Sequence, residues 1–240
     1  MKIYSILFLI MISISVNASD DFDDFESEFV IEKKSDPFSG YNRIITDFND
    51  GFYTHLVKPV AVSYGNVVHK DIRSGIDRVF DNLYFPVRFL NNLLQGKFLN
   101  AWEETQRFCI NTTFGILGFN DIAKKEFNIK KHNEDFGQTL GFYGVGSGPH
   151  IVLPLLGPSN LRDTISIIPD SYLSPIDYEE RTWYTFTDSF GEYIAVRGYD
   201  KLNNYSLNVE RYDNIKKNAI DLYPYLKSIY EQHRQKLIEE

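Results

Sequence analysis

The sequence predicts an all-α domain, and two observations indicate this fold class. Apolar residues recur at intervals of three and four over long stretches of the chain, which is the period of an amphipathic helix. No alternating run is long enough to require a sheet, and no repeat of fixed period appears. The 240 residues, 43% of them hydrophobic, are enough for one sizeable domain with its own core.

Residues 1–18 are predicted to be a cleavable signal peptide. Lys2 supplies a positive charge, an apolar run follows over 3–14, and Val16 and Ala18 place small residues at the positions that a signal peptidase reads. An uncleaved anchor is the alternative, but the run is shorter than the roughly 20 residues that span a bilayer. The mature chain would begin at Ser19 and be exported.

The acidic residues 19–35 are predicted to form a flexible tether, because charge repulsion and sparse apolar content disfavour folding. The ordered helical domain is predicted over residues 36–240. Asp36 and Pro37 predict the start of its first helix, with a capping carboxylate followed by proline at the first helical position.

Three further parts of the chain show helical periodicity. Residues 72–94 have apolar positions spaced by three and four, and Pro86 is expected to kink this helix. Residues 98–114 carry a second pattern that ends near Gly115. The C-terminal part predicts two amphipathic helices, interrupted around 203–204 and again near Pro224.

Residues 137–158 (GQTLGFYGVGSGPHIVLPLLGP) differ from the helical remainder. They are rich in glycine and proline, which alternate with uncharged apolar residues. Surface loops are ordinarily polar, because their backbone and side chains face water. The segment is therefore predicted to pack in an apolar setting, either against protein or along a cavity.

Charge and cysteine content exclude several classes of protein. With 25 basic and 33 acidic residues, the chain has a formal net charge of −8 and gains nothing from nucleic-acid phosphates, so no nucleic-acid partner is expected. Any contact with a membrane is expected to be apolar. The single cysteine, Cys109, excludes an intramolecular disulfide framework and a cysteine zinc cluster, and its apolar neighbours predict burial.

No catalytic, metal or cofactor site is predicted, and the chain is not expected to be an enzyme. Ser147 lies in a glycine-rich run, but Val145 stands where the serine-elbow motif requires glycine. No histidine pair has the spacing of a helical metal site. His132 with Glu134 and Asp135 could bind a metal, and a solvated turn is the favoured alternative.

Six blocks of sequence, in order along the chain, resemble the MlaA (VacJ) family. Together they run from residue 36 to about residue 234. The blocks are 36–43 (DPFSGYNR) with 48–49, 57–61 (VKPVA), 91–96 (NNLLQG), 107–123 (RFCINTTFGILGFNDIA), 136–163 (FGQTLGFYGVGSGPHIVLPLLGPSNLRD), and 225–230 (YLKSIY) with His233.

The resemblance implies a ring-like arrangement of amphipathic helices with a central amphipathic channel, embedded in one leaflet of the outer membrane. Family members remove mislocalised phospholipid from the outer leaflet and pass it to a soluble periplasmic carrier, which maintains lipid asymmetry. Some lie beside a trimeric porin. An outer-membrane phospholipase and a porin-associated structural protein are the alternatives from other functional classes.

Two groups of residues are candidates for this function. Exposing an acyl chain of roughly 16 carbons to water costs on the order of 10 kcal/mol, so an apolar path is expected. The candidates to line it, with core packing as the alternative for each, are Leu140, Gly144, Val145, Gly146, Gly148, Pro149, Ile151, Leu153, Pro154 and Leu155. The expected polar supports, with headgroup contact as the alternative, are Asn42, Arg43, Asn49, Asn111, Arg162 and Asp163.

Attachment to the membrane departs from the family pattern. Many members carry an acylated cysteine directly after the signal, whereas Ser19 occupies that position in this sequence. The protein is therefore expected on the periplasmic side of the outer membrane without a lipid, held by its amphipathic belt, by a partner, or by both. The sequence leaves the direction of lipid flow open.

Overall fold

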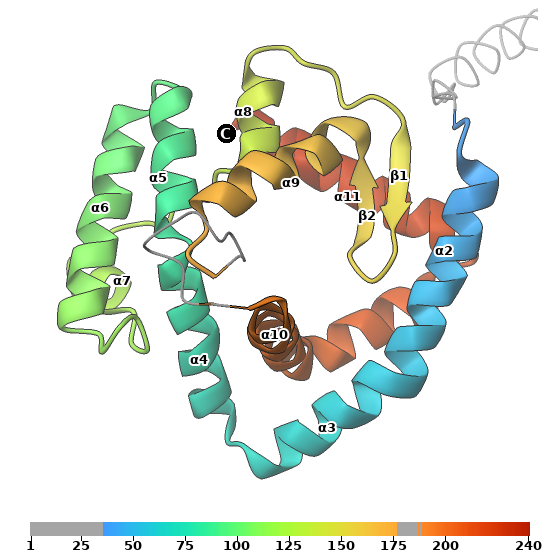
Figure 1. Cartoon of the computed structure of the whole chain (residues 1–240), viewed down its shortest axis with the longest axis horizontal. Helices are drawn as coiled ribbons and strands as arrows, with labels where there is room; N and C mark the ends of the chain where they lie inside the picture. The colour runs from blue at the N-terminus through green and yellow to red at the C-terminus, as the bar shows by residue number, and fades with distance from the viewer. Residues whose placement is uncertain (1–35, 177–186, 188) are drawn as a thin grey trace, which may run out of the picture. The chain divides into compact units, whose positions relative to one another are not determined.

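The computed structural model describes residues 36–176, 187 and 189–240. The predicted signal peptide at 1–18 and tether at 19–35 lie outside the described residues. Residues Phe38–Glu240 form one compact unit, built almost entirely from helices (Figure 1). The predicted all-α class is thereby confirmed.

The elements follow one another with short connections. The N-terminal half contains α2 (Ser39–Phe52), the π-helix η1 (Tyr53–Val57), α3 (Lys58–Val67), α4 (Lys70–Leu83), α5 (Phe85–Leu94) and α6 (Phe98–Thr113). The C-terminal half contains α7 (Ile122–Phe127), α8 (Phe136–Phe142), β1 (His150–Leu153), β2 (Gly157–Asn160), α9 (Leu161–Leu173), α10 (Phe190–Asn218) and α11 (Leu222–Glu239).

Contacts between these elements close a circuit, which can be followed in Figure 1. Helix α2 continues through η1 into α3, and both α3 and α4 pack on α10. Helix α4 leads into α5, which contacts α8 and α9. Helix α8 packs on α11, and α11 returns to α2. This order agrees with the ring-like arrangement that the resemblance implies.

A short hairpin that begins within the Gly/Pro segment and ends at Asn160 is a departure from the purely helical expectation. Strands β1 and β2 pair antiparallel, with His150 opposite Asn160. The outer edge of β1 is satisfied by asparagines of α2. The Asn42 amide donates to the His150 carbonyl at 2.9 Å, and the Val152 amide donates to Asn42 Oδ1 at 2.8 Å. Side-chain amides thus replace a third strand, so no alternating pattern is required.

Asn49 repeats the same contact at the tip of the hairpin. Its amide donates to the Leu153 carbonyl at 3.0 Å, and its Oδ1 accepts from the Leu155 amide at 2.7 Å. Asn49 follows Asn42 by seven residues, which is about two helical turns, so both side chains lie on one face of α2. The hairpin is therefore fixed along α2 at two points.

Two predicted features near helix ends are wrong. Helix α2 begins at Ser39 after Phe38, so Asp36 does not cap it. Pro86 does not kink a single long helix. It lies in the first turn of α5, after α4 has ended at Leu83, where its missing N–H leaves no intrahelical bond unmade.

Helix α10 is also longer than predicted, because it continues through the expected interruption at Asn203. This side chain is fully buried. Its amide donates to the Arg73 carbonyl at 2.9 Å, and its Oδ1 accepts from the Tyr64 hydroxyl at 3.1 Å. The asparagine is a tertiary contact and not a turn signal. The ends near Gly115 and Pro224 agree with prediction, since α6 ends at Thr113 and α11 begins at Leu222.

Polar and apolar side chains are distributed differently from those of a typical water-soluble domain, in which apolar side chains are buried and polar ones are exposed. Among the described residues, buried polar side chains outnumber buried hydrophobic ones, and many large apolar side chains are exposed. Examples are Ile44 on α2, Trp102 on α6 and Ile168 on α9, each more than half exposed. Exposed apolar side chains in such number are typical of a surface that contacts lipid, another protein or a bound ligand.

Cys109 is also exposed. It lies on α6, seven residues after the exposed Trp102 and therefore on the same face of the helix. Its predicted burial is wrong, because Cys109 lies on the exposed face of α6, whereas its apolar neighbours Phe108 and Ile110 are half-buried. No helix in the described parts of the chain is long and apolar enough to cross a membrane.

Loss of Asn42 is predicted to destabilise the fold. Asn42→Ala removes the partners of two buried backbone groups of β1, and each unpaired group costs about 1–3 kcal/mol. The free energy of unfolding, measured by urea denaturation in detergent, should fall by roughly 2–5 kcal/mol. The neighbouring Arg43→Ala is the control, because Arg43 forms a solvent-exposed ion pair with Asp221. An equal loss in both variants would contradict this account.

Candidate functional site

A cavity of about 820 Å³ lies among α2, η1, α3, the hairpin, α9, α10 and α11. Its volume is within the range of about 300–1,000 Å³ that is usual for small-molecule sites. One part of its wall is apolar and comes mainly from η1, the hairpin tip, α9 and α10. That part includes Phe52, Leu56, Val57, Val60, Leu153, Leu155, Leu156, Ile167, Ile194 and Leu202.

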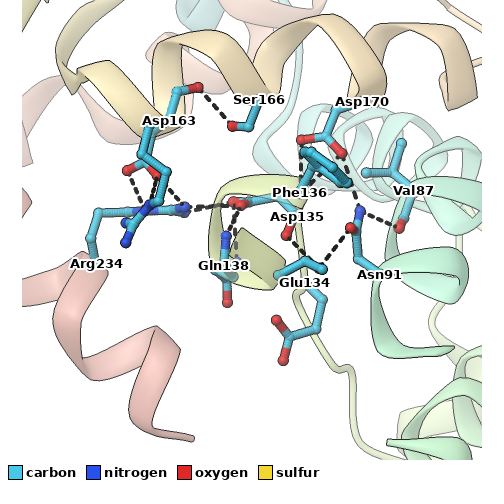
Figure 2. A network of polar contacts seen from close by, with 12 residues as sticks. Val87, Asn91, Glu134, Asp135, Phe136, Gln138, Asp163, Ser166, Asp170 and Arg234 are labelled. Carbon is cyan, nitrogen blue, oxygen red and sulfur yellow. Dashed lines mark hydrogen bonds and ion pairs between the residues drawn. The ribbon is translucent and has the colours of Figure 1, made fainter. Parts of the chain in front are cut away.

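The other part of the wall is a network of charged side chains, shown in Figure 2. Arg234 of α11 reaches Asp135 at the start of α8 through two bonds of 2.6 and 2.9 Å. The same guanidinium donates to Asp163 of α9 at 3.1 Å, and the Tyr230 hydroxyl donates to Asp163 at 2.7 Å. Three helices are thus joined at the cavity wall.

Charge pairing in this network outweighs the cost of burial. Burial alone would raise the pKa of Asp135 and Asp163, but hydrogen bonds and charge from arginines hold both pKa values below the ordinary range. Burial likewise opposes the charge of Arg234, and the two carboxylates nevertheless raise its pKa. All three groups therefore remain ionised near neutral pH.

Asp170 is the exception within the network. It follows Asp163 by seven residues on α9, accepts the Phe136 amide at 3.1 Å and accepts the Asn91 side-chain amide at 3.1 Å (Figure 2). No arginine is bonded to it among the described residues. Burial, reinforced by the nearby charge of Asp135, raises the pKa of Asp170 to about 7. The cavity wall thus contains a carboxyl group that titrates near neutrality.

Helix α10 adds two cations to the cavity wall, Arg197 and Lys201. The Arg197 guanidinium lies over the Tyr84 ring, 5.0 Å from its centroid, and 3.9 Å from Asp200. Burial lowers the pKa of Arg197, although guanidinium groups remain charged in proteins. The cavity therefore combines an apolar region with acidic and basic groups, which is an amphipathic lining.

Of the ten predicted channel residues, Leu153 and Leu155 line this cavity. The others lie elsewhere in the segment: Leu140 is half-buried in α8, Ile151 is half-buried in β1, and Pro154 is exposed at the hairpin turn. Gly144, Val145, Gly146, Gly148 and Pro149 belong to the connection between α8 and β1. The assignment of these residues to a channel stays a prediction.

Close packing accounts for two glycines of the segment. A Cβ at Gly137 would lie 2.5 Å from Asp163 Oδ1 and 2.7 Å from Arg234 Nη2. A Cβ at Gly141 would lie 2.6 Å from the Ile238 side chain. These glycines allow α8 to approach the charged network and α11, so part of the glycine content reflects helix packing.

The six predicted polar supports make contacts between elements. Asn42 and Asn49 hold the hairpin, as described above. Asn111 of α6 accepts the Ala123 amide at 2.9 Å and donates to Asp121 at 3.0 Å. Arg162 is buried, pairs with the adjacent Asp163 at 2.9 Å and donates to the Val145 carbonyl at 3.3 Å, whereas Arg43 is half exposed and pairs with Asp221 at 2.6 Å. Asp163 also lines the cavity, so its assignment to scaffold or to headgroup contact stays open to test.

The residues of the alternative metal site point to separate partners. His132 Nε2 is 2.6 Å from Glu103, Glu134 binds Lys97 at 2.7 Å, and Asp135 binds Arg234. Within the described residues, no group of three or more histidine, cysteine or acidic side chains could hold a metal ion. The Ser147 hydroxyl donates to the Gly148 carbonyl at 3.4 Å.

Sequence reasoning missed most of the cavity wall. The apolar contribution of η1 and α10, including Leu56 and Ile194, comes from segments far apart in the chain. Their helical periodicity shows that they have an apolar face, but it does not distinguish a face on a cavity from a face on a core. Of the charged wall, the sequence predicted Asp163 as a polar support and named Asp135 only within the alternative metal site, while Asp170, Arg197, Lys201 and Arg234 were not predicted.

Stability is predicted to depend on the protonation of Asp170. Its pKa rises from 3.8 to about 7 on folding, so its favourable contribution is full below pH 4 and is lost as pH rises through 7. Wild-type protein should lose stability between pH 5 and pH 8, by on the order of 1–4 kcal/mol from this group. Asp170→Asn, which mimics the protonated form, should reduce that loss. Urea denaturation in detergent at pH 5 and pH 8 measures this change in the free energy of unfolding. An identical pH dependence in wild type and Asp170→Asn would refute the role of Asp170.

Several proteins are similar to this chain in sequence. A protein of Rickettsia conorii is 30% identical over 248 residues, which cover 100% of this chain and 95% of the relative. The intermembrane phospholipid transport system lipoprotein MlaA of Haemophilus influenzae is 32% identical over 178 residues, covering 73% of this chain and 70% of the relative. The protein of the same name in Escherichia coli is 34% identical over 163 residues, covering 67% and 63%.

A solved structure agrees with the fold. It comes from work on the structural basis for maintenance of bacterial outer membrane lipid asymmetry. The two structures superpose with a TM-score of 0.70 at 28% sequence identity, and the match covers 85% of this chain and 100% of the solved chain. The sequence model of the MlaA lipoprotein family matches residues 34–237. The chain therefore belongs to the MlaA family.

Proposed function

We propose that this protein is the outer-membrane component of a phospholipid transport system, which removes mislocalised phospholipid from the outer leaflet and so maintains lipid asymmetry. One observation carries the proposal: a closed circuit of helices encloses an amphipathic cavity, and many large apolar side chains of the domain are exposed. The names of the Haemophilus and Escherichia relatives, which refer to intermembrane phospholipid transport, support the same function.

The outward apolar side chains suit a protein that lies within one leaflet. Ile44 and Ile168 lie on α2 and α9 of the circuit, Trp102 lies on α6, which packs on α5 of the circuit, and each of the three is more than half exposed. Amphipathic helices can lie in the plane of a leaflet without spanning it. We place the domain in the inner leaflet of the outer membrane, where its apolar surface replaces contacts between acyl chains.

The cavity supplies the two environments that a phospholipid needs. Its apolar wall, with Leu56, Leu155 and Ile194, shelters acyl chains, which would otherwise cost about 0.8 kcal/mol per CH₂ exposed to water. Arg197 and Lys201 are the cations suited to the phosphate of the headgroup. The cargo class is therefore a phospholipid, held through its phosphate and its chains.

Transfer by this chain is passive in our proposal, because the sequence contains no P-loop motif for nucleotide hydrolysis. A soluble periplasmic carrier would accept the lipid and set the direction of flow. A trimeric porin is the proposed neighbour in the membrane.

We also propose that the protein is not an enzyme. Purified protein should release no fatty acid from phospholipid. Release of fatty acid that Ser147→Ala abolishes would show a phospholipase instead.

Blocking the cavity is predicted to abolish transport. Gly198 lines it from α10, and a Cβ added there meets nothing within 4 Å, so Gly198→Trp can fill the cavity without a backbone clash. In a strain lacking the gene, surface-exposed phospholipid should rise. Wild type should restore the normal level, and Gly198→Trp should not.

Gly40→Trp is the matched control for this experiment. Gly40 is exposed on α2, outside the cavity wall, and a Cβ added there also meets nothing within 4 Å. Gly40→Trp should restore the normal level of surface phospholipid. Full restoration by Gly198→Trp, with both variants present at wild-type amounts, would contradict the transport path.

Attachment to the membrane is proposed to be apolar and independent of an acylated cysteine. The one cysteine, Cys109, lies within α6. Carbonate and high-salt washes should leave the protein in the outer membrane, labelled palmitate should not be incorporated, and Cys109→Ser should not change retention. Quantitative release by either wash would refute the embedded belt, and palmitate incorporation would refute attachment without a lipid.

A further inference from the structure

A second, smaller cavity of about 270 Å³ lies beside the main cavity, between α2, η1, the hairpin, α10 and α11. We infer that this lateral pocket binds one acyl chain of a diacyl phospholipid while the other chain occupies the main cavity, and that the Tyr53 hydroxyl donates to the ester carbonyl of the chain in the lateral pocket. The inference rests on the proposed function and specifies where each of the two acyl chains of the transported lipid is bound.

The two cavities share a wall. Phe52, Val57, Leu155, Leu156 and Tyr205 line both of them. The Leu155 backbone is held by Asn49, so the hairpin tip stands at the boundary between the two spaces. A ligand with two chains joined at one end fits a cavity that divides in this way. The lateral volume is too small for a whole phospholipid and suits part of one unbranched chain.

Polar side chains at the lateral pocket are mostly bonded within the protein. The Thr46 hydroxyl donates to the Asn42 carbonyl at 2.8 Å, and the Tyr212 hydroxyl donates to Asp50 at 3.1 Å. Asn49 uses both ends of its amide on the hairpin. Water needs two to four polar partners to occupy a cavity, and a cavity without them takes up apolar ligands. The pocket is therefore suited to a hydrocarbon chain.

Two other tyrosines of the lateral pocket remain, Tyr53 and Tyr205, and of these Tyr53 is the one whose hydroxyl is fully buried without a partner in the described part of the chain. Its side chain is 6% exposed, and its ring packs against Tyr212 and Tyr205 with centroid distances of 4.3 and 5.6 Å. Its hydroxyl is buried and has no hydrogen-bond partner among the described residues. Buried hydroxyl groups are ordinarily paired, so an acceptor from a ligand is expected. Tyr53 also begins the π-helix η1, and such turns are frequent at functional sites.

The chemistry of the pocket favours an ester over a free fatty acid. An acyl ester offers one carbonyl acceptor followed by a hydrocarbon chain, which matches one hydroxyl donor followed by an apolar wall. A free carboxylate would bring a charge, and no lysine or arginine in the described part of the chain lines the lateral pocket. Burial of an unpaired charge is strongly unfavourable.

The first experiment tests the hydrogen bond. Mature protein in detergent would be titrated with dipalmitoyl phosphatidylethanolamine or its diether analogue, with binding followed by native mass spectrometry. Wild type should prefer the diester by about 2- to 10-fold, the usual effect of one hydrogen bond. Tyr53→Phe should bind both equally. Tyr64→Phe, which alters a tyrosine bonded to Tyr199 and Asn203 outside both cavities, should keep the preference. An unchanged preference in Tyr53→Phe would overturn the assignment of Tyr53.

The second experiment tests the pocket itself. Leu226 lines the lateral pocket and not the main cavity, so Leu226→Trp fills only the smaller space. It should weaken binding of the diacyl lipid several-fold and leave the one-chain lysophosphatidylethanolamine unaffected. Equal effects on both lipids, or none on either, would overturn the lateral acyl site.

These outcomes separate the inference from the function on which it rests. Wild type that binds neither lipid would refute the phospholipid-transport proposal itself. Wild type that binds both, with Leu226→Trp weakening both alike, would refute only the lateral site. If Leu226→Trp does not fold, the ester preference of wild type against Tyr53→Phe still decides the inference.

Discussion

Polar contacts between helices are the constraint on which this structure depends. A domain with many exposed apolar side chains and an amphipathic cavity has few apolar side chains left for a core, and the described residues show that distribution. Asn42 joins α2 to the hairpin, Asn203 joins α10 to α4, and Arg234 joins α11 to α8 and α9. These bonds gain strength where water is excluded, and they cost most when one partner is lost.

The same contacts shape the cavity. Asn49 holds the hairpin tip so that Leu155 and Leu156 form part of the apolar wall. The carboxylates that bind Arg234 form part of the polar wall. The groups that stabilise the fold therefore also divide the cavity into two environments, and a change in one of them is expected to affect stability and lipid binding together.

Helices could be predicted from the sequence because their apolar faces repeat with a regular period, whether those faces meet lipid, a cavity or a core. The hairpin could not, because its edge is completed by Asn42 and Asn49 from a distant helix. In the sequence Asn203 indicates a helix interruption, whereas in the structure it is a buried side chain within α10 that bonds to the Arg73 carbonyl of α4. Local preference is overridden in each case by a tertiary partner.

The candidate site was predictable only in part for the same reason. The glycine-rich segment contributes Leu153 and Leu155 to the wall, while Gly137 has its own role in close packing. The rest of the wall comes from helices that meet only after folding. Family resemblance identified the class of protein, and the geometry was needed to identify the residues around the cavity.

The path of the lipid is the central claim, and photocrosslinking in intact cells tests it most directly. A benzophenone side chain at Ile194, on the cavity wall, should form phospholipid adducts, and one at Asp71, a charged and highly exposed position of α4 outside the cavity wall, should form far fewer. Strong adducts at Asp71 with none at Ile194 would contradict a lipid path through this cavity.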